Sequence, residues 1–363
     1  MLRRGGVITH AARVISEGGL VAFPTETVYG LGANALNAEA VAKLYAVKGR
    51  PGDNPLILHV RNLGGAIALA GDFPEHARKL AREYWPGPLT LVVNKSPALP
   101  AWVGGHPCFT ARTVALRVPS HPSALALIEA AGVPIAAPSA NKSGAPSPTD
   151  ASHVEADLGG AVDYILDGGE ISVGLESTVL DVTGGGAVIL RPGAVTAEML
   201  SAVLGTPVRE AALVSGESPR SPGTKYRHYA PRAEMTVVCG NPEACAAYIA
   251  GKLSAESRPG GILATAQTEK YYKNYFKDRI HFYTLPEAGD SASGGLQPGE
   301  IAALAAGDRA DPQTVARNLY ACLRRFDSLG AEVIYAEGVG ESGLGRAVMD
   351  RMVKAAGGNV VFV

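Results

Sequence analysis

Short apolar segments alternate with amphipathic segments of helical period along most of the chain, and this alternation restricts the fold more than any other feature. It predicts strands at 20–23, 56–60, 89–93 and 114–118 and helices at 38–47, 74–84 and 122–132. Such alternation is typical of α/β proteins. Because short turns such as Gly184–Gly186 join some neighbouring strands, the N-terminal sheet should be mixed and twisted rather than purely parallel.

A segment rich in Ser, Pro and Gly divides the chain, whose 363 residues suffice for two domains. We predict an N-terminal domain at 1–207, a long linker at 208–232 and a smaller C-terminal domain at 233–363. The last should be a Rossmann-like three-layer α/β domain, with strands at 235–238, 261–264, 281–284 and 333–336 and helices at 242–252, 300–306, 311–328 and 344–356. Residues 338–343 match G-x-G-x-x-G, but the acidic residue expected about 20 positions later is missing, so a tight strand–helix turn is favoured.

Charge and composition exclude several classes of protein. The formal net charge is −1, so no overall field attracts nucleic acid or membrane. Residues 1–150 nevertheless hold 14 Lys and Arg against 9 Asp and Glu, which suits a small anionic substrate. Four cysteines without a CxxC pair indicate reduced thiols. No run of 18 apolar residues is present, so we expect a cytoplasmic protein without a membrane span.

Two cations, Lys48 and Arg50, lie on a turn between a predicted helix and a predicted strand. Gly49, Pro51 and nearby Gly and Pro residues interrupt regular structure there. Such a turn can hold an Arg fork and a Lys charge toward a bound phosphate. The alternative is that basic residues in a last helical turn simply offset the helix dipole.

Polar loops follow other predicted strands. The loop 24–32 gathers threonines and the carboxylate of Glu26 after a strand, where α/β proteins often meet ligands, although a hairpin connection explains it too. Arg117 lies inside an apolar strand and therefore needs a partner, either a bound anion or a Glu of the chain. Ser139 and Asn141 could expose backbone N–H groups to an anion or simply form a turn.

The linker carries the run Lys225-Tyr-Arg-His-Tyr229. Five side chains in a row that can hydrogen-bond or stack favour a segment that docks on a surface over a plain linker. No HExxH, CxxC or Ser/His/Asp order is present, and His106-Pro-Cys108 alone is too little for a metal site.

Together these motifs resemble the YrdC-like threonylcarbamoyl-AMP synthase family in its longer two-domain form. The motifs that carry the resemblance are Pro24–Gly32, Lys48-Gly-Arg50, Asn54-Pro-Leu, Arg117-Val-Pro, Ser139-Ala-Asn141, the linker run 221–231 and the segment Gly343–Arg351. The resemblance extends over nearly the whole chain, and no signature position departs from the family pattern.

The resemblance implies a nucleotidyltransferase that makes threonylcarbamoyl-AMP and pyrophosphate from L-threonine, bicarbonate or CO2, and ATP. It implies threonine contacts from Thr27, His59, Arg117 and Ser177. It implies ATP contacts from Arg50, Asn54, Thr113, Ser139, Asn141, Ser147, Arg191 and Tyr229, with Lys48 and Arg50 as the catalytic cations. Mg²⁺ should be held by the ATP phosphates rather than by protein side chains. Partners should be a separate tRNA threonylcarbamoyl transferase and, at most weakly, tRNA itself.

Three other classes of function compete with this one. The first is an RNA-binding module of a tRNA-modification complex without catalysis of its own, against which near-neutral charge and sparse aromatics among the basic residues argue. The second is a carbamoyl-transfer maturation enzyme, but the zinc-binding CxxC repeats of that larger architecture are absent. The third makes residues 233–363 a regulatory sensor for a separate ligand.

Overall fold

The computed structural model describes residues 4–211, 228–285 and 295–363 and divides into two units. The first comprises Met1–Ser143 and Ser147–Tyr226, and the second comprises Gly144–Pro146 and Arg227–Val363. The short segment 144–146 therefore clusters with the C-terminal part, which the sequence did not indicate. Most of the predicted linker, including Lys225–Arg227, lies outside the described residues.

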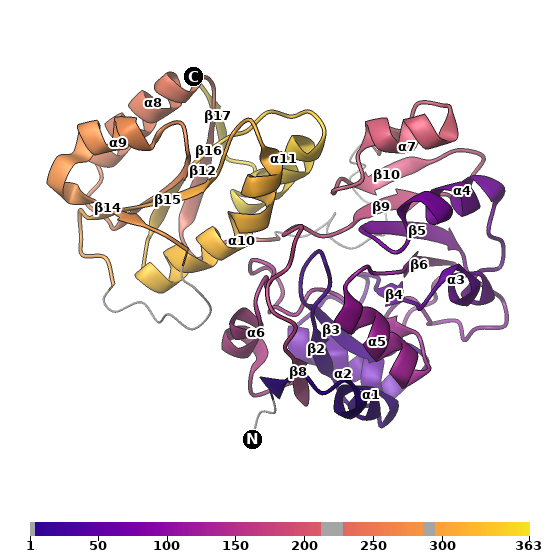
Figure 1. Cartoon of the computed structure of the whole chain (residues 1–363). Helices are drawn as coiled ribbons and strands as arrows, with labels where there is room; N and C mark the ends of the chain where they lie inside the picture. The colour runs from indigo at the N-terminus through magenta and orange to yellow at the C-terminus, as the bar shows by residue number, and fades with distance from the viewer. Residues whose placement is uncertain (1–3, 212–227, 286–294) are drawn as a thin grey trace. The chain divides into compact units, whose positions relative to one another are not determined.

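The first unit is built on an eleven-stranded mixed sheet within the described residues (Figure 1). Its order is β1-β8-β2-β3-β7-β4-β6-β5-β9-β10-β11. The strands are β1 (Arg4–Gly5), β2 (Val21–Phe23), β3 (Gly30–Asn34), β4 (Ile57–His59), β5 (Leu89–Asn94), β6 (Thr113–Arg117), β7 (Ile135–Ala136), β8 (Tyr164–Leu166), β9 (Thr178–Asp181), β10 (Val188–Arg191) and β11 (Arg209–Glu210). Because parallel and antiparallel pairs alternate, the predicted mixed sheet is confirmed.

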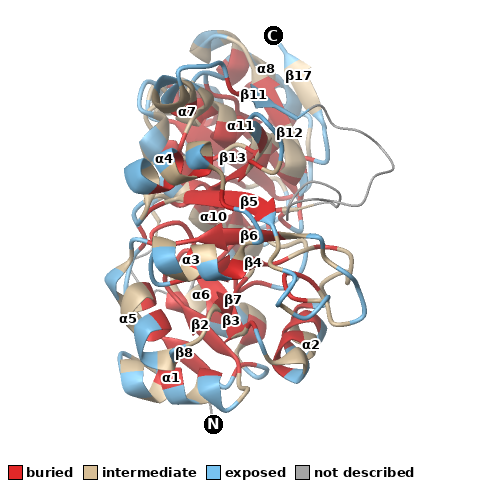
Figure 2. Ribbon diagram, turned by 90° about the vertical axis from the view of Figure 1, so that its right-hand side faces the viewer, coloured by how far each residue is buried: buried red, intermediate tan, exposed pale blue. Residues whose placement is uncertain are grey.

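Seven helices of the described residues belong to this unit. They are α1 (Ile8–Ser16), α2 (Ala38–Lys48), α3 (Leu63–Leu69), α4 (Glu75–Tyr84), α5 (Pro122–Ala131), α6 (Ala151–Leu158) and α7 (Ala197–Leu204). One apolar core joins α1 and α5 to strands β2, β7 and β8 through residues such as Ile15, Phe23 and Leu127. Figure 2 shows these strands buried while the outer helix faces are exposed.

The second unit is a three-layer α/β domain, as predicted. Within its described residues, six parallel strands follow the order β14-β15-β13-β16-β12-β17. They are β12 (Glu234–Cys239), β13 (Gly260–Thr265), β14 (Ile280–Tyr283), β15 (Ile301–Gly307), β16 (Val333–Glu337) and β17 (Val360–Phe362). Helices α8 (Pro242–Ser254) and α9 (Glu269–Phe276) pack on one face, and α10 (Pro312–Leu329) and α11 (Leu344–Ala355) on the other (Figure 1). A single 3-10 turn (Lys277–Arg279) links α9 to β14.

The helix predicted at 300–306 is wrong: Ile301–Gly307 forms strand β15 instead. The Ala-rich segment has high helix propensity, which favoured that prediction. In the structure β15 lies between β14 and β13 and is largely buried. Small residues such as Ala302 and Ala303 fit between helices that cover both faces. Tertiary burial therefore outweighs local propensity here.

No helix among the described residues is long and apolar enough to cross a membrane. Cys108, Cys239, Cys245 and Cys322 are free thiols in the structure.

Candidate active site

One end of the sheet in the first unit collects polar residues from several strands. His59 ends β4 and is opposite Arg117, which ends the parallel strand β6. The antiparallel strand β5 begins at this same end, next to the start of β9. Thr90 of β5 and Ser177, just before β9, therefore come close to Arg117. Arg191, at the end of β10, completes the row.

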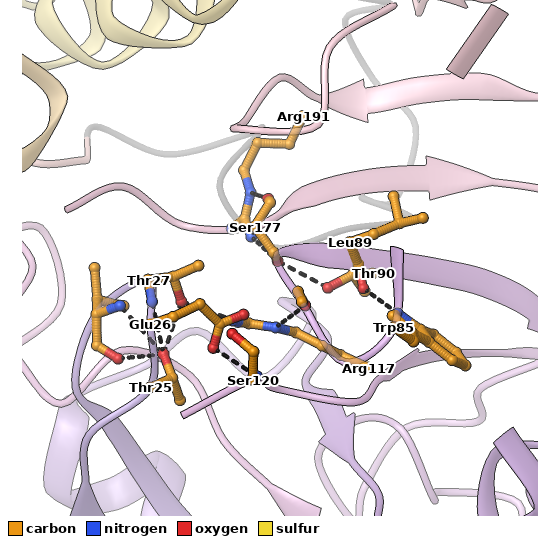
Figure 3. A network of polar contacts seen from close by, with 12 residues as sticks. Thr25, Glu26, Thr27, Trp85, Leu89, Thr90, Arg117, Ser120, Ser177 and Arg191 are labelled. Atoms are coloured by element: carbon orange, nitrogen blue, oxygen red, sulfur yellow. Dashed lines mark hydrogen bonds and ion pairs between the residues drawn. The ribbon is translucent and has the colours of Figure 1, made fainter. Parts of the chain in front are cut away.

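Arg117 is a buried cation held by the loop that follows β2. Its side chain is only 4% exposed, and its Nη2 donates to Glu26 Oε1 at 2.7 Å. Its Nη1 donates to Thr27 Oγ1 at 3.0 Å and its Nε to the Gly87 carbonyl. Figure 3 shows Glu26 and Thr27 converging on this guanidinium. Three of five N–H groups are used within the described part of the chain, so one on each terminal nitrogen remains for a further acceptor.

Glu26 is the acidic partner of Arg117. A cation inside an apolar strand requires a partner of this kind. The Glu26 side chain is 8% exposed, and Oε2 accepts the Ser120 backbone N–H at 3.0 Å. Burial raises the pKa of Glu26, but the charge of Arg117 and its hydrogen bond outweigh this and leave the pKa below its usual range. The carboxylate is therefore ionised at neutral pH and fixes the orientation of Arg117. The loop is a hairpin between β2 and β3, yet its threonines are not incidental.

A second buried cation, Arg191, lies on β10, which is separated from β6 by β5 and β9. Arg191 donates from Nε and Nη2 to the Ser177 carbonyl at 3.1 and 3.0 Å, and from Nη2 to Ser177 Oγ at 3.2 Å. Ser177 Oγ also bonds Thr90 Oγ1 at 2.8 Å. Ser177 thus connects strands β5 and β10 (Figure 3). Two guanidinium groups with hydroxyls between them form an environment for an anion.

His59 contributes a neutral ring to this end of the sheet. It is 3% exposed, and its Nδ1 has no hydrogen-bond partner among the described residues. Burial, and then the nearby Arg117 charge, lower the pKa of His59 to about 3. The imidazole is therefore uncharged at physiological pH and can exchange a hydrogen bond with a ligand without adding charge.

The pH dependence of the free energy of unfolding should reflect the lowered pKa of His59. Because the ordinary His pKa is 6.5 and the folded value is about 3, the unfolded chain binds more protons between those pH values. Stability should therefore fall as the pH is lowered from 6.5 toward 3, by about 4 kcal/mol from this group alone. Urea unfolding at several pH values should show a flatter dependence for His59→Gln. Equal pH slopes for both proteins would contradict a neutral buried His59.

Lys48 occupies a separate cluster. Asn37 caps the start of α2 and left-handed Gly49 its end, as predicted. Lys48 is 4% exposed, and its Nζ donates to the carbonyls of Ser139 and Asn141 at 2.6 and 2.5 Å. Ser139 Oγ bonds Asn141 Oδ1 in turn. These contacts go beyond a helix-dipole effect, because the ammonium fixes the backbone of the loop after β7.

Arg50 binds the start of the strand that follows it. Its Nη2 donates to Asn54 Oδ1 and to the Pro55 carbonyl, both at 2.7 Å, and its Nε to the Asn54 carbonyl. Tyr45 OH bonds that same carbonyl. Arg50 and Asn54 are therefore held together by hydrogen bonds, and their contact with ATP stays a prediction.

The remaining predicted residues are distributed differently. Ser147 is fully buried and bonds Glu176 Oε1 at 2.5 Å, next to Ser177. Thr113 begins β6, at the end opposite Arg117, which at about 3.3 Å per residue separates their backbones by roughly 13 Å. Tyr229 belongs to the second unit.

Tyr229 packs against residues of its own unit. It is 5% exposed and has φ of 64°, which is uncommon for a residue other than glycine. Its ring lies 5.5 Å from that of Tyr320, and the Arg351 guanidinium lies 5.5 Å from its centre. The next residue, Ala230, donates to the Gly144 carbonyl. The end of the linker is therefore anchored firmly, and its contact with ATP stays a prediction.

Comparison with known proteins assigns the family. A family model described as "Telomere recombination" matches residues 13–193, and one described as "Threonylcarbamoyl-AMP synthase, C-terminal domain" matches residues 195–357. A threonylcarbamoyl-AMP synthase of Pyrococcus abyssi is 44% identical over 97% of this chain and 95% of its own length. The chain belongs to the threonylcarbamoyl-AMP synthase family. The Bacillus subtilis member is 42% identical over 98% of this chain and 94% of its own.

A solved structure supports the same family. The crystal structure of P. abyssi Sua5 complexed with L-threonine matches with a TM-score of 0.82 at 41% identity, covering 100% of this chain and 99% of that one. The predicted family, two-domain α/β fold and class of enzyme are therefore confirmed for this threonylcarbamoyl-AMP synthase family member.

Sequence reasoning missed some members of the site. Glu26 was noticed only as a carboxylate in the loop, and Thr90 and Glu176 were not singled out. The sequence points to Glu26 through Arg117, because a cation in an apolar strand needs an acidic partner. The sequence gives no such signal for Thr90 and Glu176. Their contacts depend on the fold, which brings together residues about 90 positions apart (Thr90 and Ser177) and about 30 positions apart (Ser147 and Glu176).

Proposed function

We propose that this chain converts L-threonine, bicarbonate or CO2, and ATP into threonylcarbamoyl-AMP and pyrophosphate, with water released when bicarbonate is the carbon source. The observation that carries the proposal is the buried Glu26–Arg117–Thr27 cluster. It holds a guanidinium rigidly while leaving N–H groups on both terminal nitrogens for an added anion. A carboxylate is the natural partner of such a fork, and a member of the family has been solved with L-threonine.

Threonine is proposed to bind at the end of the sheet where Arg117 and His59 lie. Arg117 binds the amino acid carboxylate, with Thr27 fixing one edge of the guanidinium. His59 is the nearby neutral group available to the threonine hydroxyl or nitrogen. Ser177 places its hydroxyl between this region and Arg191, so threonine and the α-phosphate come together there.

The ATP side uses the two other clusters. Arg50 with Asn54, and Lys48 with the loop of Ser139 and Asn141, supply positive charge and hydrogen-bond donors to the triphosphate. Thr113, Ser147, Arg191 and Tyr229 are assigned to the rest of the nucleotide. Mg²⁺ is proposed to be bound by the ATP phosphates, where it would neutralise charge.

The chemistry needs positioning more than a protein nucleophile. The threonine nitrogen attacks CO2, loses a proton and becomes a carbamate. A carbamate oxygen then attacks the α-phosphorus while the bond to the pyrophosphate breaks. Fixed cations stabilise the charge that develops in such a transfer. The mixed anhydride reacts with water, so burial of the site also protects the product.

The product is assigned to a separate transferase that modifies adenosine in tRNA. The experiment is to incubate the full chain with L-threonine, bicarbonate and MgATP. Pyrophosphate and a threonylcarbamoyl-adenylate, detected by mass spectrometry, should appear together and require all three substrates. Binding of tRNA without any pyrophosphate would instead favour the non-catalytic RNA-binding module.

A further inference from the structure

The segment Trp85–Thr90, which follows α4 and includes the start of β5, contacts two of the side chains proposed to bind threonine. The Gly87 carbonyl accepts the Arg117 Nε–H at 3.2 Å, and the Thr90 hydroxyl lies 2.8 Å from Ser177 Oγ. Figure 3 shows the Thr90 side chain directed at Ser177. The segment therefore touches the threonine side of the proposed site at two points.

Backbone hydrogen bonds hold this segment in place. The Gly87 N–H donates to the Val118 carbonyl at 2.8 Å, and the Pro88 carbonyl accepts the Thr178 N–H at 3.0 Å. Val118 and Thr178 each directly follow one of the two proposed threonine-binding residues. The position of Thr90 is therefore fixed relative to both of them, which is what the support of a binding group requires.

Thr90 brings a hydroxyl into an otherwise apolar part of β5. It is 0% exposed, and so are its neighbours Leu89 and Leu91. Valine has nearly the same shape and would bury no polar group there. Among the described residues, Ser177 Oγ is the only hydrogen-bond partner of the Thr90 side chain. The Thr90 hydroxyl therefore serves a single contact.

The direction of this hydrogen bond follows from the other partner of Ser177. A guanidinium can only donate, so Ser177 Oγ accepts the Arg191 Nη2–H at 3.2 Å. If Ser177 also donated to Thr90, the buried Thr90 proton would have no acceptor in the part of the chain that the structure describes. If Thr90 donates instead, Ser177 accepts twice and its own O–H is left for a ligand. A carboxylate ligand can only accept, so its binding selects the second arrangement.

We propose that Thr90 is a positioning residue that directs the Ser177 O–H toward a carboxylate oxygen of bound threonine. Thr90 does not touch the ligand. It donates to Ser177 Oγ, and Ser177 then donates to the ligand. Without the Thr90 hydroxyl, the Ser177 O–H loses the partner that sets its direction, so threonine should bind more weakly while ATP is little affected. This inference rests on the proposed function, in which Ser177 contacts threonine.

The test measures threonine binding to the full chain by isothermal titration calorimetry, together with KM values and urea unfolding. Thr90→Val keeps the shape and removes the hydroxyl. The Kd and KM for L-threonine should rise about fivefold to tenfold, as expected for one lost hydrogen bond, while the KM for ATP stays within about twofold. Thr90→Ser keeps the hydroxyl and removes a buried methyl group. Its urea midpoint should fall while its Kd for threonine stays within about twofold of the wild type.

A double-mutant cycle tests whether Thr90 acts through Ser177. Ser177→Ala should itself raise the Kd for threonine, and adding Thr90→Val should change that Kd by less than about twofold because the shared contact is already gone. The matched control is Thr268→Val in the second unit. Thr268 is also 0% exposed, and its hydroxyl donates to the Thr265 carbonyl at 2.9 Å. This control should lower the urea midpoint and leave the Kd for threonine unchanged.

Three outcomes would overturn the positioning role of Thr90. These are a wild-type Kd for threonine in Thr90→Val, an equal loss of affinity in Thr90→Ser, and effects of Thr90→Val and Ser177→Ala that multiply. Each would show that the Thr90 hydroxyl only satisfies the core.

Adenylate formation by the wild type separates this inference from the proposed function. If the wild type makes the adenylate and Thr90→Val changes nothing, only the positioning role fails. If the wild type binds threonine but releases no pyrophosphate with all substrates present, the proposed function fails, and the Kd values still decide the role of Thr90. A wild type that does not bind threonine would overturn both.

Discussion

Arg117→Met should reduce threonine-dependent adenylate formation at least a hundredfold and lower the free energy of unfolding by about 3–5 kcal/mol. The loss of stability is expected because Glu26 would be left as a buried charge without its partner. The loss of activity is expected because the guanidinium proposed to bind the threonine carboxylate is gone. Urea unfolding and pyrophosphate release measure the two effects separately.

The double variant Glu26→Gln/Arg117→Met distinguishes folding from function. Removing both charges should restore much of the stability, because no unpaired ion remains, while activity stays lost. Glu26→Gln alone keeps Arg117 but weakens its orientation, so the KM for threonine should rise about tenfold while the KM for ATP changes little. Recovery of activity together with stability in the double variant would show that Arg117 only supports the fold.

Lys48→Met should reduce ATP–pyrophosphate exchange by about a hundredfold to a thousandfold, the range for a lost electrostatic donor. It should also cost about 3 kcal/mol of stability, because the buried carbonyls of Ser139 and Asn141 lose their shared donor. Arg50→Met should weaken exchange through the loss of its contacts with Asn54. In both variants the loss of exchange should exceed what the unfolded fraction explains.

The matched control lies on the same helix. Lys43 is exposed and bonds Asp163 on the surface, so Lys43→Met should leave exchange within about twofold of the wild type because surface ion pairs contribute little. Exchange retained after removal of both Lys48 and Arg50 would contradict their assignment to the chemistry.

The sequence allowed the fold class to be predicted because strand and helix periods alternate clearly. Long amphipathic or capped segments such as α2, with Asn37 before it and Gly49 after it, were predicted nearly to the residue. Segments with competing signals were not. Residues 300–306 have the composition of a helix but are buried as a strand, and the aromatic-rich α9 was not predicted as a helix.

The cations of the candidate site could be predicted from the sequence, but most of the groups that bind them could not. Arg117 and Lys48 stood out because a cation in or beside an apolar segment must be compensated. Which oxygen compensates it depends on the pairing of distant strands, as with Glu26, 91 positions from Arg117. The carbonyls that bind Lys48 carry no side-chain signature at all. Backbone acceptors of this kind become visible only once the loop after β7 is folded.

In the proposed reaction, a carbamate of threonine attacks the α-phosphorus of ATP in this site. The most direct measurement is the reaction in ¹⁸O-equilibrated bicarbonate and water, followed by mass spectrometry of the adenylate. Both carbamate oxygens come from the labelled bicarbonate, so we expect two ¹⁸O atoms in the adenylate, one in the carbamoyl carbonyl and one bridging to the phosphorus of the AMP moiety, with unlabelled pyrophosphate released. Formation of ADP and ¹⁸O-labelled inorganic phosphate, with no label in AMP, would contradict it.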